Sequence, residues 1–459
     1  MGVDLRSMLN PKSVAIIGAS QNPEKVGHII LQNYINSGYA GKLFAINKDA
    51  ESILGVKAYR HIGEIKERLD LAVIAIPAPF VPQVLEECGK AGVRSTIVVT
   101  AGFEEIGQKE LQDKIVEISE RYKMPMLGPN CLGVIDTRAR TDTLFLPTYK
   151  LSKPGVGYVS FISQSGAAGS TILDLIAGEG FGLSKFISYG NAAYIDESDI
   201  LEYLMNDDDT KVIIMYIEGI KNGKKFIEVA RKVTKKKPVV VLKGGRTSVG
   251  QQATLSHTAS LAGDYQVYEG IFQQFGFTIA NDLNDLLYYA KTLVSEPAPK
   301  GNRIGIITNG GGAGVITTDA VGYTRELKLA ELSDKSKQLL RKKMPPLVNI
   351  RIPLDLAGDA GGDRYETAVA AMRDDPNIDM IIVIALFQTP GADSGVVAKL
   401  VHFKADIEKP MIVISIGAEY TQIHNRMMEE SGLPVYDSPS AAVKALAELY
   451  KYYNYKGRK

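Results

Sequence analysis

The chain has 459 residues, which suggests about three domains. Its 53 basic and 52 acidic side chains give a net charge of +1. This balance argues against a nucleic-acid coat protein or a membrane-surface protein, since both carry a basic excess. Hydrophobic residues make up 45% of the chain and charged residues 23%, the proportions of a globular protein rather than a disordered one.

The cysteine content and the N-terminus indicate where the protein works. The two cysteines, Cys88 and Cys131, are too few for a disulfide framework or a four-cysteine zinc site, and we interpret both as small buried residues. Asp4 and Arg6 interrupt the N-terminal segment before any apolar stretch, so it does not resemble a secretory signal. We therefore expect a cytoplasmic protein without a metal site or a membrane segment.

Short β-branched runs alternate with longer amphipathic stretches along the whole chain. Continuous apolar runs separated by helical segments are typical of parallel strands that are buried on both faces. We therefore predict an α/β fold of doubly wound domains. The predicted strands cover residues 13–17, 71–76, 96–99, 211–217, 238–242, 303–308, 380–386 and 411–416.

Two breaks divide the pattern into three parts. Residues 137–155 lose periodicity and end in Lys-Pro-Gly, and residues 296–301 form a proline-rich linker. We therefore expect domains over residues 1–147, 148–296 and 301–459. Each one contains a strand, a turn of small residues and then a helix.

These three turns are candidate anion sites. A helix N-terminus presents unpaired N–H groups and a partial positive charge, and small residues let an anion approach closely. Tight packing of helix against sheet is the alternative explanation for the small residues. The turns consist of Gly18-Ala19-Ser20, Ser163-Gln164-Ser165-Gly166 and Asn309-Gly310-Gly311-Gly312-Ala313-Gly314.

The second strand of the first domain ends in Asn47-Lys48, which bears on the type of nucleotide. A site for NAD would need an acidic residue there for the ribose hydroxyls. A cation suits a phosphorylated ribose instead, such as that of NADP or coenzyme A (CoA). A tight turn with a solvated lysine remains the simpler alternative.

His257 lies in an unusually long segment without periodicity, which follows the strand 238–242 and is rich in Gly, Ser and Thr. Such loops inside α/β domains are usually functional. A neutral imidazole is a good nucleophile toward phosphoryl donors, and the hydroxyls of Ser256 and Thr258 could hold the transferred group. A nucleophilic histidine needs a carboxylate partner, and Glu218 at the end of strand 211–217 is the candidate. An incidental loop histidine and a solvated strand terminus are the alternatives.

Together these segments resemble the α subunits of ADP-forming acetyl-CoA synthetases, within the succinyl-CoA synthetase superfamily of acyl-CoA ligases. The resemblance covers essentially the whole chain. Its most specific part is the combination of SQSGA with SHTASLAG, and the other matching segments include IIGASQNPEKVG, VVTAGFEE, LGPNCLGV, ITNGGGAGV and PLDLAGDAGGDRY.

The resemblance implies a Rossmann-like CoA-binding domain, then two flavodoxin-like domains of the succinyl-CoA synthetase kind. It implies catalytic roles for His257 and Glu218. It places phosphate against Ser163, Gln164, Ser165, Gly166, Gly311, Gly312, Ala313 and Asn130. It assigns CoA contacts to Gly18, Ala19, Ser20, Lys25, Val26, Gly27, Asn47, Lys48, Ile76, Pro77, Ala78, Thr100 and Ala101.

The implied reaction is acyl-CoA + ADP + phosphate ⇌ acid + ATP + CoA, through an acyl phosphate and a phosphohistidine on a swinging loop. The family binds ADP and Mg²⁺ on an ATP-grasp domain, and no segment of this sequence resembles one. A separate β subunit in an α2β2 heterotetramer is therefore implied.

Two other interpretations of the function remain open. A CoA-binding regulatory or scaffold protein of the same fold would keep Gly18 and Lys48 without needing His257. An NADP-dependent reductase would need a catalytic Tyr-Lys or similar arrangement, which we do not find near a predicted strand end. The sequence does not indicate which acid is used or which direction the reaction runs.

Overall fold

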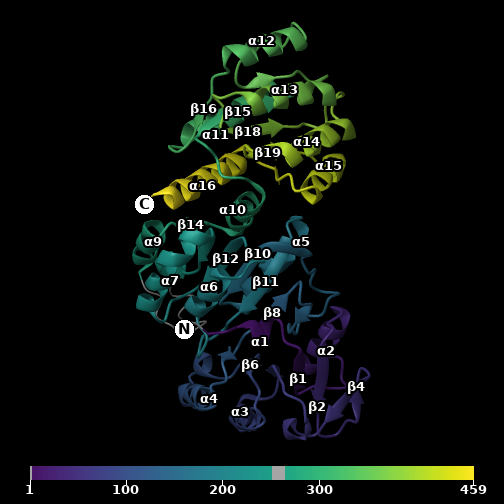
Figure 1. The fold of residues 1–459 in the computed structure, drawn as a ribbon, viewed down its shortest axis with the longest axis vertical. Helices are drawn as coiled ribbons and strands as arrows, with labels where there is room; N and C mark the ends of the chain where they lie inside the picture. The colour runs from purple at the N-terminus through teal and green to yellow at the C-terminus, as the bar shows by residue number, and fades with distance from the viewer. Residues whose placement is uncertain (1–2, 251–263, 459) are drawn as a thin grey trace. The chain divides into compact units, whose positions relative to one another are not determined.

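The computed structural model describes residues 3–250 and 264–458. The chain forms two compact units (Figure 1). The first comprises Met1–Gly178 and Gly182–Ile279, and the second comprises Glu179–Phe181 and Ala280–Lys459. Two sheets belong to the first unit and one to the second.

The first sheet has seven strands in the order β3-β4-β2-β1-β5-β6-β7, parallel except for β3. The central strands β1 and β5 are buried along their whole length, which explains their unbroken apolar sequence. The strands are β1 Ser13–Ile17, β2 Lys42–Ile46, β3 Ser52–Ile53, β4 Val56–Tyr59, β5 Leu71–Ile74, β6 Ser95–Val98 and β7 Met126–Leu127. The helices are α1 Arg6–Leu9, α2 Val26–Asn36, α3 Val81–Lys90 and α4 Lys109–Arg121, with short 3-10 turns at Ile62–Glu64, Ala78–Phe80 and Glu104–Ile106.

The second sheet has the order β14-β13-β12-β10-β11-β8-β9. In this sheet β8 pairs antiparallel with β11, and β9 pairs antiparallel with β8. These two strands come from the end of the segment that we expected to form the first domain. The strands are β8 Gly133–Asp136, β9 Thr141–Asp142, β10 Val156–Ser163, β11 Leu183–Ser188, β12 Val212–Ile217, β13 Val239–Lys243 and β14 Thr278–Ile279. The helices are α5 Gly166–Gly178, α6 Glu197–Met205, α7 Gly223–Lys236 and α9 Tyr265–Gln274.

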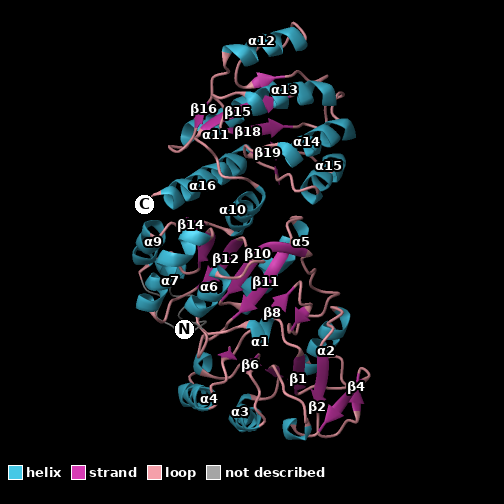
Figure 2. Cartoon of the chain, in the orientation of Figure 1, coloured by secondary structure: helices cyan, strands magenta, loops and turns pink. Residues whose placement is uncertain are grey.

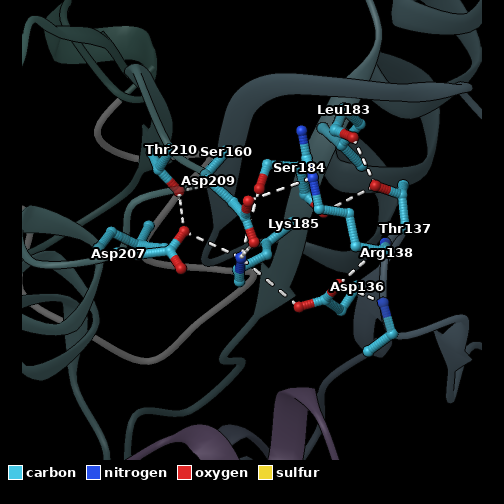
Figure 3. Close-up of polar contacts among 12 residues, drawn as sticks. Asp136, Thr137, Arg138, Ser160, Leu183, Ser184, Lys185, Asp207, Asp209 and Thr210 are labelled. Carbon is cyan, nitrogen blue, oxygen red and sulfur yellow. Dashed lines mark hydrogen bonds and ion pairs between the residues drawn. The ribbon is translucent and has the colours of Figure 1, made fainter.

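A buried lysine fastens β8 to the second sheet. Lys185 on β11 lies 3.5 Å from the Asp136 carboxylate on β8 and 2.9 Å from that of Asp207, which precedes β12 (Figure 3). Its side chain is only 3% exposed, and Asp209 is 3.8 Å away. The cluster therefore joins three neighbouring parts of the sheet through one ammonium group.

The second unit has a parallel sheet in the order β16-β15-β18-β19-β20, with β17 paired to β15. Helix α13 contacts β15 and α16 contacts β19, so helices lie on more than one side of the strands (Figure 2). The strands are β15 Arg303–Thr308, β16 Lys328–Leu329, β17 Leu354–Asp355, β18 Met380–Ile384, β19 Met411–Ile414 and β20 Val435–Tyr436. The helices are α10 Leu283–Ser295, α11 Gly311–Tyr323, α12 Asp334–Lys343, α13 Gly362–Asp374, α14 Ser394–Asp406, α15 Glu419–Glu430 and α16 Pro439–Gly457.

The predicted α/β class with three parallel-sheet domains is confirmed. The predicted domain limits at residues 147 and 296–301 stay a prediction. Over residues 3–250 and 264–458, none of the helices combines the length and the apolar composition needed to cross a bilayer.

Candidate functional site

A cavity of about 1280 Å³ in the first unit lies where strands of both its sheets end. The residues that directly follow β1, β2, β5 and β6 line it from the first sheet, and those that follow β10, β11 and β12 line it from the second. Ligands of open α/β sheets bind at the carboxyl ends of parallel strands. The seven strand ends therefore mark this cavity as the candidate site.

The turn between β1 and α2 forms one wall. Gly18 has φ +94°, a left-handed conformation that favours glycine, and a Cβ on it would lie 2.3 Å from the Ala75 carbonyl oxygen. A Cβ on Gly27 would lie 2.0 Å from the Gly18 carbonyl oxygen. Gly27 therefore lets the start of α2 pack against the turn, and Gly18 lets the turn pass close to the backbone that follows β5.

Asn47 has a structural role that we did not predict. Its side-chain amide donates to the Ala19 carbonyl at 2.8 Å and accepts from the backbone N–H groups of Asp49 and Ala50. These bonds fix the end of β2 against the β1–α2 turn. Lys48, which comes next, lines the cavity and is exposed, as is Lys25. The two ammonium groups make this part of the cavity suited to an anionic ligand.

The start of α5 forms another wall, together with the end of β12. The Gln164 side-chain oxygen accepts from the backbone N–H groups of Glu218 and Gly219 at 2.7 and 3.1 Å. Because its oxygen already accepts these two hydrogen bonds, Gln164 can bind a ligand by donating hydrogen bonds from its side-chain nitrogen. Ser165 and Gly166 line the cavity beside it, at the N-terminus of the 13-residue helix α5. This wall can bind an anion through helix N–H groups.

Glu218 lines the same cavity and is only 5% exposed. The Tyr216 hydroxyl donates to its carboxylate at 3.3 Å. Burial, followed by the charge of Glu218, raises the pKa of Tyr216 to about 12, so the tyrosine stays a hydrogen-bond donor at neutral pH.

Four polar residues of the cavity, Glu104, Glu105, Asn191 and Lys221, were not predicted, and they form a network with Asn130, which was predicted. Asn130 donates to Asn191 at 3.2 Å, and Asn191 donates to Glu105 at 2.5 Å. Lys221 forms an ion pair with Glu104 at 3.2 Å. The network crosses between the two sheets of the first unit, so it fixes the relative positions of their strand ends.

Glu105 is held as a carboxylate in this network. Burial opposes its ionisation, but hydrogen bonds from the Gly102 N–H and the Asn191 amide outweigh burial and lower its pKa. The signal that could have identified these residues was their position three to seven residues after the end of a strand.

The cavity brings together most of the predicted site residues of the first unit. Those lining it are Gly18, Ala19, Ser20, Lys25, Val26, Gly27, Asn47, Lys48, Ile76, Pro77, Thr100, Ala101, Asn130, Gln164, Ser165, Gly166 and Glu218. Ala78 and Ser163 are buried, and each is next in sequence to a residue that lines the cavity, but neither of them lines it. Gly311, Gly312 and Ala313 begin α11 in the second unit. His257 lies outside the described residues.

The cysteines are buried, as we interpreted them. Cys131 lines the cavity, yet burial raises the pKa of its thiol to about 12. A thiol in that state is a poor nucleophile at neutral pH. The cavity's chemistry must therefore come from its other groups.

Three family models match the chain in succession. A CoA binding domain matches residues 12–137, a succinyl-CoA ligase-like flavodoxin domain matches residues 156–293, and a ligase-CoA domain matches residues 304–455. Each match covers one of the three sheets apart from a few terminal strands.

Individual relatives match over nearly the full length. The α subunit of acetate–CoA ligase (ADP-forming) II of Pyrococcus furiosus is 39% identical over 452 residues, covering 96% of this chain and 97% of that one. The acetate–CoA ligase (ADP-forming) of Methanocaldococcus jannaschii is 40% identical over 454 residues, covering 98% of this chain and 63% of that longer protein. An acetyl-coenzyme A synthetase 1 of Ca. Korarchaeum cryptofilum, solved with phosphate and ADP, is 35% identical with a TM-score of 0.92, covering 99% of this chain and 97% of that one.

Proposed function

This chain belongs to the family of ADP-forming acetate–CoA ligase α subunits, and from that premise we propose that it catalyses acyl-CoA + ADP + phosphate ⇌ acid + ATP + CoA. One observation carries the proposal. A single cavity is lined at one part by the β1–α2 turn with two lysines and at another by the N-terminus of α5, with the buried Glu218 beside it.

CoA suits the first part of this cavity. Its phosphorylated ribose would pair with the ammonium groups of Lys25 and Lys48, and its length would direct the thioester toward the start of α5. Phosphate would bind there, against the N–H groups of Ser165 and Gly166 and the amides of Gln164 and Asn130. Gly311, Gly312 and Ala313 begin α11 in the second unit, and their role in phosphate binding stays a prediction.

The reaction balances in three transfers. A phosphate oxygen bonds to the thioester carbonyl carbon, the C–S bond breaks, and the CoA thiolate takes up a proton. An imidazole nitrogen of His257 then bonds to phosphorus in the acyl phosphate, and the acid leaves as its carboxylate. The phosphoryl group is finally transferred from His257 to ADP, which gives ATP. Glu218 orients the imidazole and stabilises its cationic form.

The partner follows from the same family. We propose that ADP and Mg²⁺ bind to a separate ATP-grasp β subunit, in an α2β2 heterotetramer in the cytoplasm. The α-subunit names of the Pyrococcus relatives support a separate partner.

Release of free CoA tests the first transfer. The full chain with acetyl-CoA should produce free thiol only when phosphate is added, and Gln164→Ala should slow that release by at least about tenfold. A chain that binds CoA tightly but never releases it with phosphate, with or without a co-purified partner, would support the regulatory protein instead. Binding of NADP without CoA would support the reductase.

A further inference from the structure

Three side-chain amides form a continuous hydrogen-bonded chain at one wall of the cavity. The Asn130 nitrogen donates to the Asn191 oxygen at 3.2 Å, and the Asn191 nitrogen donates to the Gln112 oxygen at 3.0 Å. Gln112 lies on α4 and is buried, whereas Asn130 and Asn191 are partly exposed and line the cavity. The amide chain therefore runs from a buried helix position to the cavity.

Two carboxylates determine which way these amides face. The Gln112 nitrogen donates to Glu104 at 2.5 Å, and the Asn191 nitrogen donates to Glu105 at 2.5 Å. An ionised carboxylate only accepts hydrogen bonds, so each amide must turn its nitrogen toward the acid. Glu105 is itself held in place, because two backbone N–H groups that precede it in the sequence donate to its other oxygen.

The orientation of one amide fixes that of the next. Both hydrogen atoms of the Asn191 nitrogen are used, by Glu105 and Gln112, so the Asn191 oxygen faces Asn130. That oxygen can accept only from the Asn130 nitrogen, because a turned-over Asn130 would bring two amide oxygens together. In the described part of the chain, the second N–H group and the oxygen of Asn130 have no other partner. Both remain for a ligand.

The backbone around the two asparagines is also held in place. Asn130 has φ +58°, and its N–H group donates to the Thr100 carbonyl at 2.9 Å. The Asn191 N–H group donates to the Pro129 carbonyl at 3.0 Å. A Cβ on Gly190 would lie 2.2 Å from the Asn130 carbonyl oxygen, so the two turns pack backbone to backbone. The side-chain amides are left to rotate, and the hydrogen-bonded chain removes that freedom.

We propose that Asn191 is a positioning residue that holds the Asn130 carboxamide in the orientation in which it meets the bound phosphate. Gln112 and Glu105 act through Asn191. The inference rests on the proposed function, which places phosphate beside Asn130. The hydrogen-bonded chain itself does not depend on that function.

The first test removes the acceptor that fixes Asn130. In Asn191→Ala the Asn130 amide can rotate, so kcat/KM for phosphate in the release of CoA from acetyl-CoA should fall by at least about tenfold. The Kd of CoA, measured by calorimetry on the same full chain, should stay within about twofold of wild type because CoA binding does not use this amide. An unchanged kcat/KM for phosphate would overturn the proposal.

Asn302→Ala is the matched control for this variant. The Asn302 side chain is likewise partly exposed and donates to the Glu326 carbonyl at 2.7 Å, but it lies in the second unit and does not line the cavity. It should leave kcat/KM for phosphate and the Kd of CoA unchanged. An equal fall in kcat/KM in Asn302→Ala and Asn191→Ala would show a general effect of losing an asparagine, and would overturn the positioning role.

The second test reverses the donor and the acceptor at positions 105 and 191. Glu105→Gln is nearly isosteric but sets a nitrogen against the Asn191 nitrogen, which should turn Asn191 over and lower kcat/KM for phosphate. Adding Asn191→Asp restores an acceptor for both neighbours, so the double variant should exceed Glu105→Gln by at least about threefold. Recovery should be partial, because Gln112 loses its donor. A double variant no better than Glu105→Gln would overturn the proposal.

The third test needs no activity. Asn130→Gly, which suits φ +58°, Asn191→Ala and the double variant form a cycle of urea midpoints of the full chain. The double variant should lose less than the sum of the single losses, because both single changes break the same hydrogen bond. Additive losses would overturn the positioning role even if phosphate releases CoA. Coupling in a chain that never releases CoA with phosphate would instead retain the hydrogen-bonded chain and reject the proposed function.

Discussion

At the scale of single residues, Glu197 has a pKa close to neutral pH, where most glutamates are already ionised. It is 1% exposed at the first position of α6, and burial raises its pKa to about 7. The neighbouring Asp196 and Asp199 bond instead to Lys225. The helix start thus holds one buried glutamate with a raised pKa beside two carboxylates that pair with a lysine.

Protonation of Glu197 links folding to pH. The folded-state pKa of Glu197 is raised, so its favourable contribution to stability is complete below about pH 4.5 and lost as pH rises through about 7. The loss amounts to at most about 3 kcal/mol. Glu197→Gln should flatten this part of the dependence of the unfolding free energy on pH, measured by urea titration between pH 4.5 and 8. The control Glu202→Gln, on the same helix, should keep the wild-type slope; an unchanged slope in Glu197→Gln would contradict the assignment.

Lys48 should distinguish CoA from its dephosphorylated form. Its ammonium lines the cavity where we place the phosphorylated ribose. Lys48→Ala should weaken CoA binding by about tenfold, since a charge-assisted bond to a phosphate is lost. It should leave the affinity for 3′-dephospho-CoA nearly unchanged, as measured by calorimetry. Equal losses for both ligands would move the phosphate away from Lys48.

At the scale of elements, the contact between α2 and its preceding turn is unusually tight. The Cβ that Gly27 lacks would lie 2.0 Å from a backbone oxygen, which no side-chain movement can relieve. Gly27→Ala should therefore displace the start of α2 and cost about 1–3 kcal/mol of stability. CoA binding should weaken with it. Gly270→Ala, on α9 where the added methyl group meets open space, should be neutral or slightly stabilising. A wild-type melting temperature for Gly27→Ala would contradict the packing argument.

The Lys185 cluster makes a prediction for the second sheet. Lys185→Met leaves the carboxylates of Asp136 and Asp207 buried without their cation (Figure 3). Removing one partner of a buried ion pair costs about 3–5 kcal/mol. The exposed Lys211→Met, one position before β12, should cost far less in the same thermal unfolding experiment. Similar losses in both variants would show that the cluster contributes no more than a surface charge.

At the scale of the whole molecule, the sequence was most informative where local pattern decides structure. Buried strands such as β1 and β15 were predicted because parallel strands have continuous apolar sequences, whereas β11, with the sequence LSKFIS, was not. The turns at Gly18 and Gln164 were predicted because small residues follow those strands. The strands β8 and β9 were not, since they are short and the second lies in a segment without periodicity.

The cavity network was harder to predict for a physical reason. Glu105, Asn191 and Lys221 follow three different strands and are 30 to 116 residues apart in the sequence. Their meeting depends on how the two sheets of the first unit pack, which no local pattern encodes. Glu218, by contrast, was identified because it directly follows a buried strand and therefore had to lie at the ligand edge.

The central claim is that His257 of this chain is phosphorylated after thioester cleavage and then transfers its phosphoryl group to ADP. The most direct measurement incubates the full chain with acetyl-CoA and ³²P-phosphate and locates the label by acid lability and peptide mapping. We expect acid-labile label on the peptide that contains His257, dependent on acetyl-CoA, and none in His257→Ala. Label that persists in His257→Ala, or a correctly folded wild type that binds acetyl-CoA and phosphate without becoming labelled, would contradict the account.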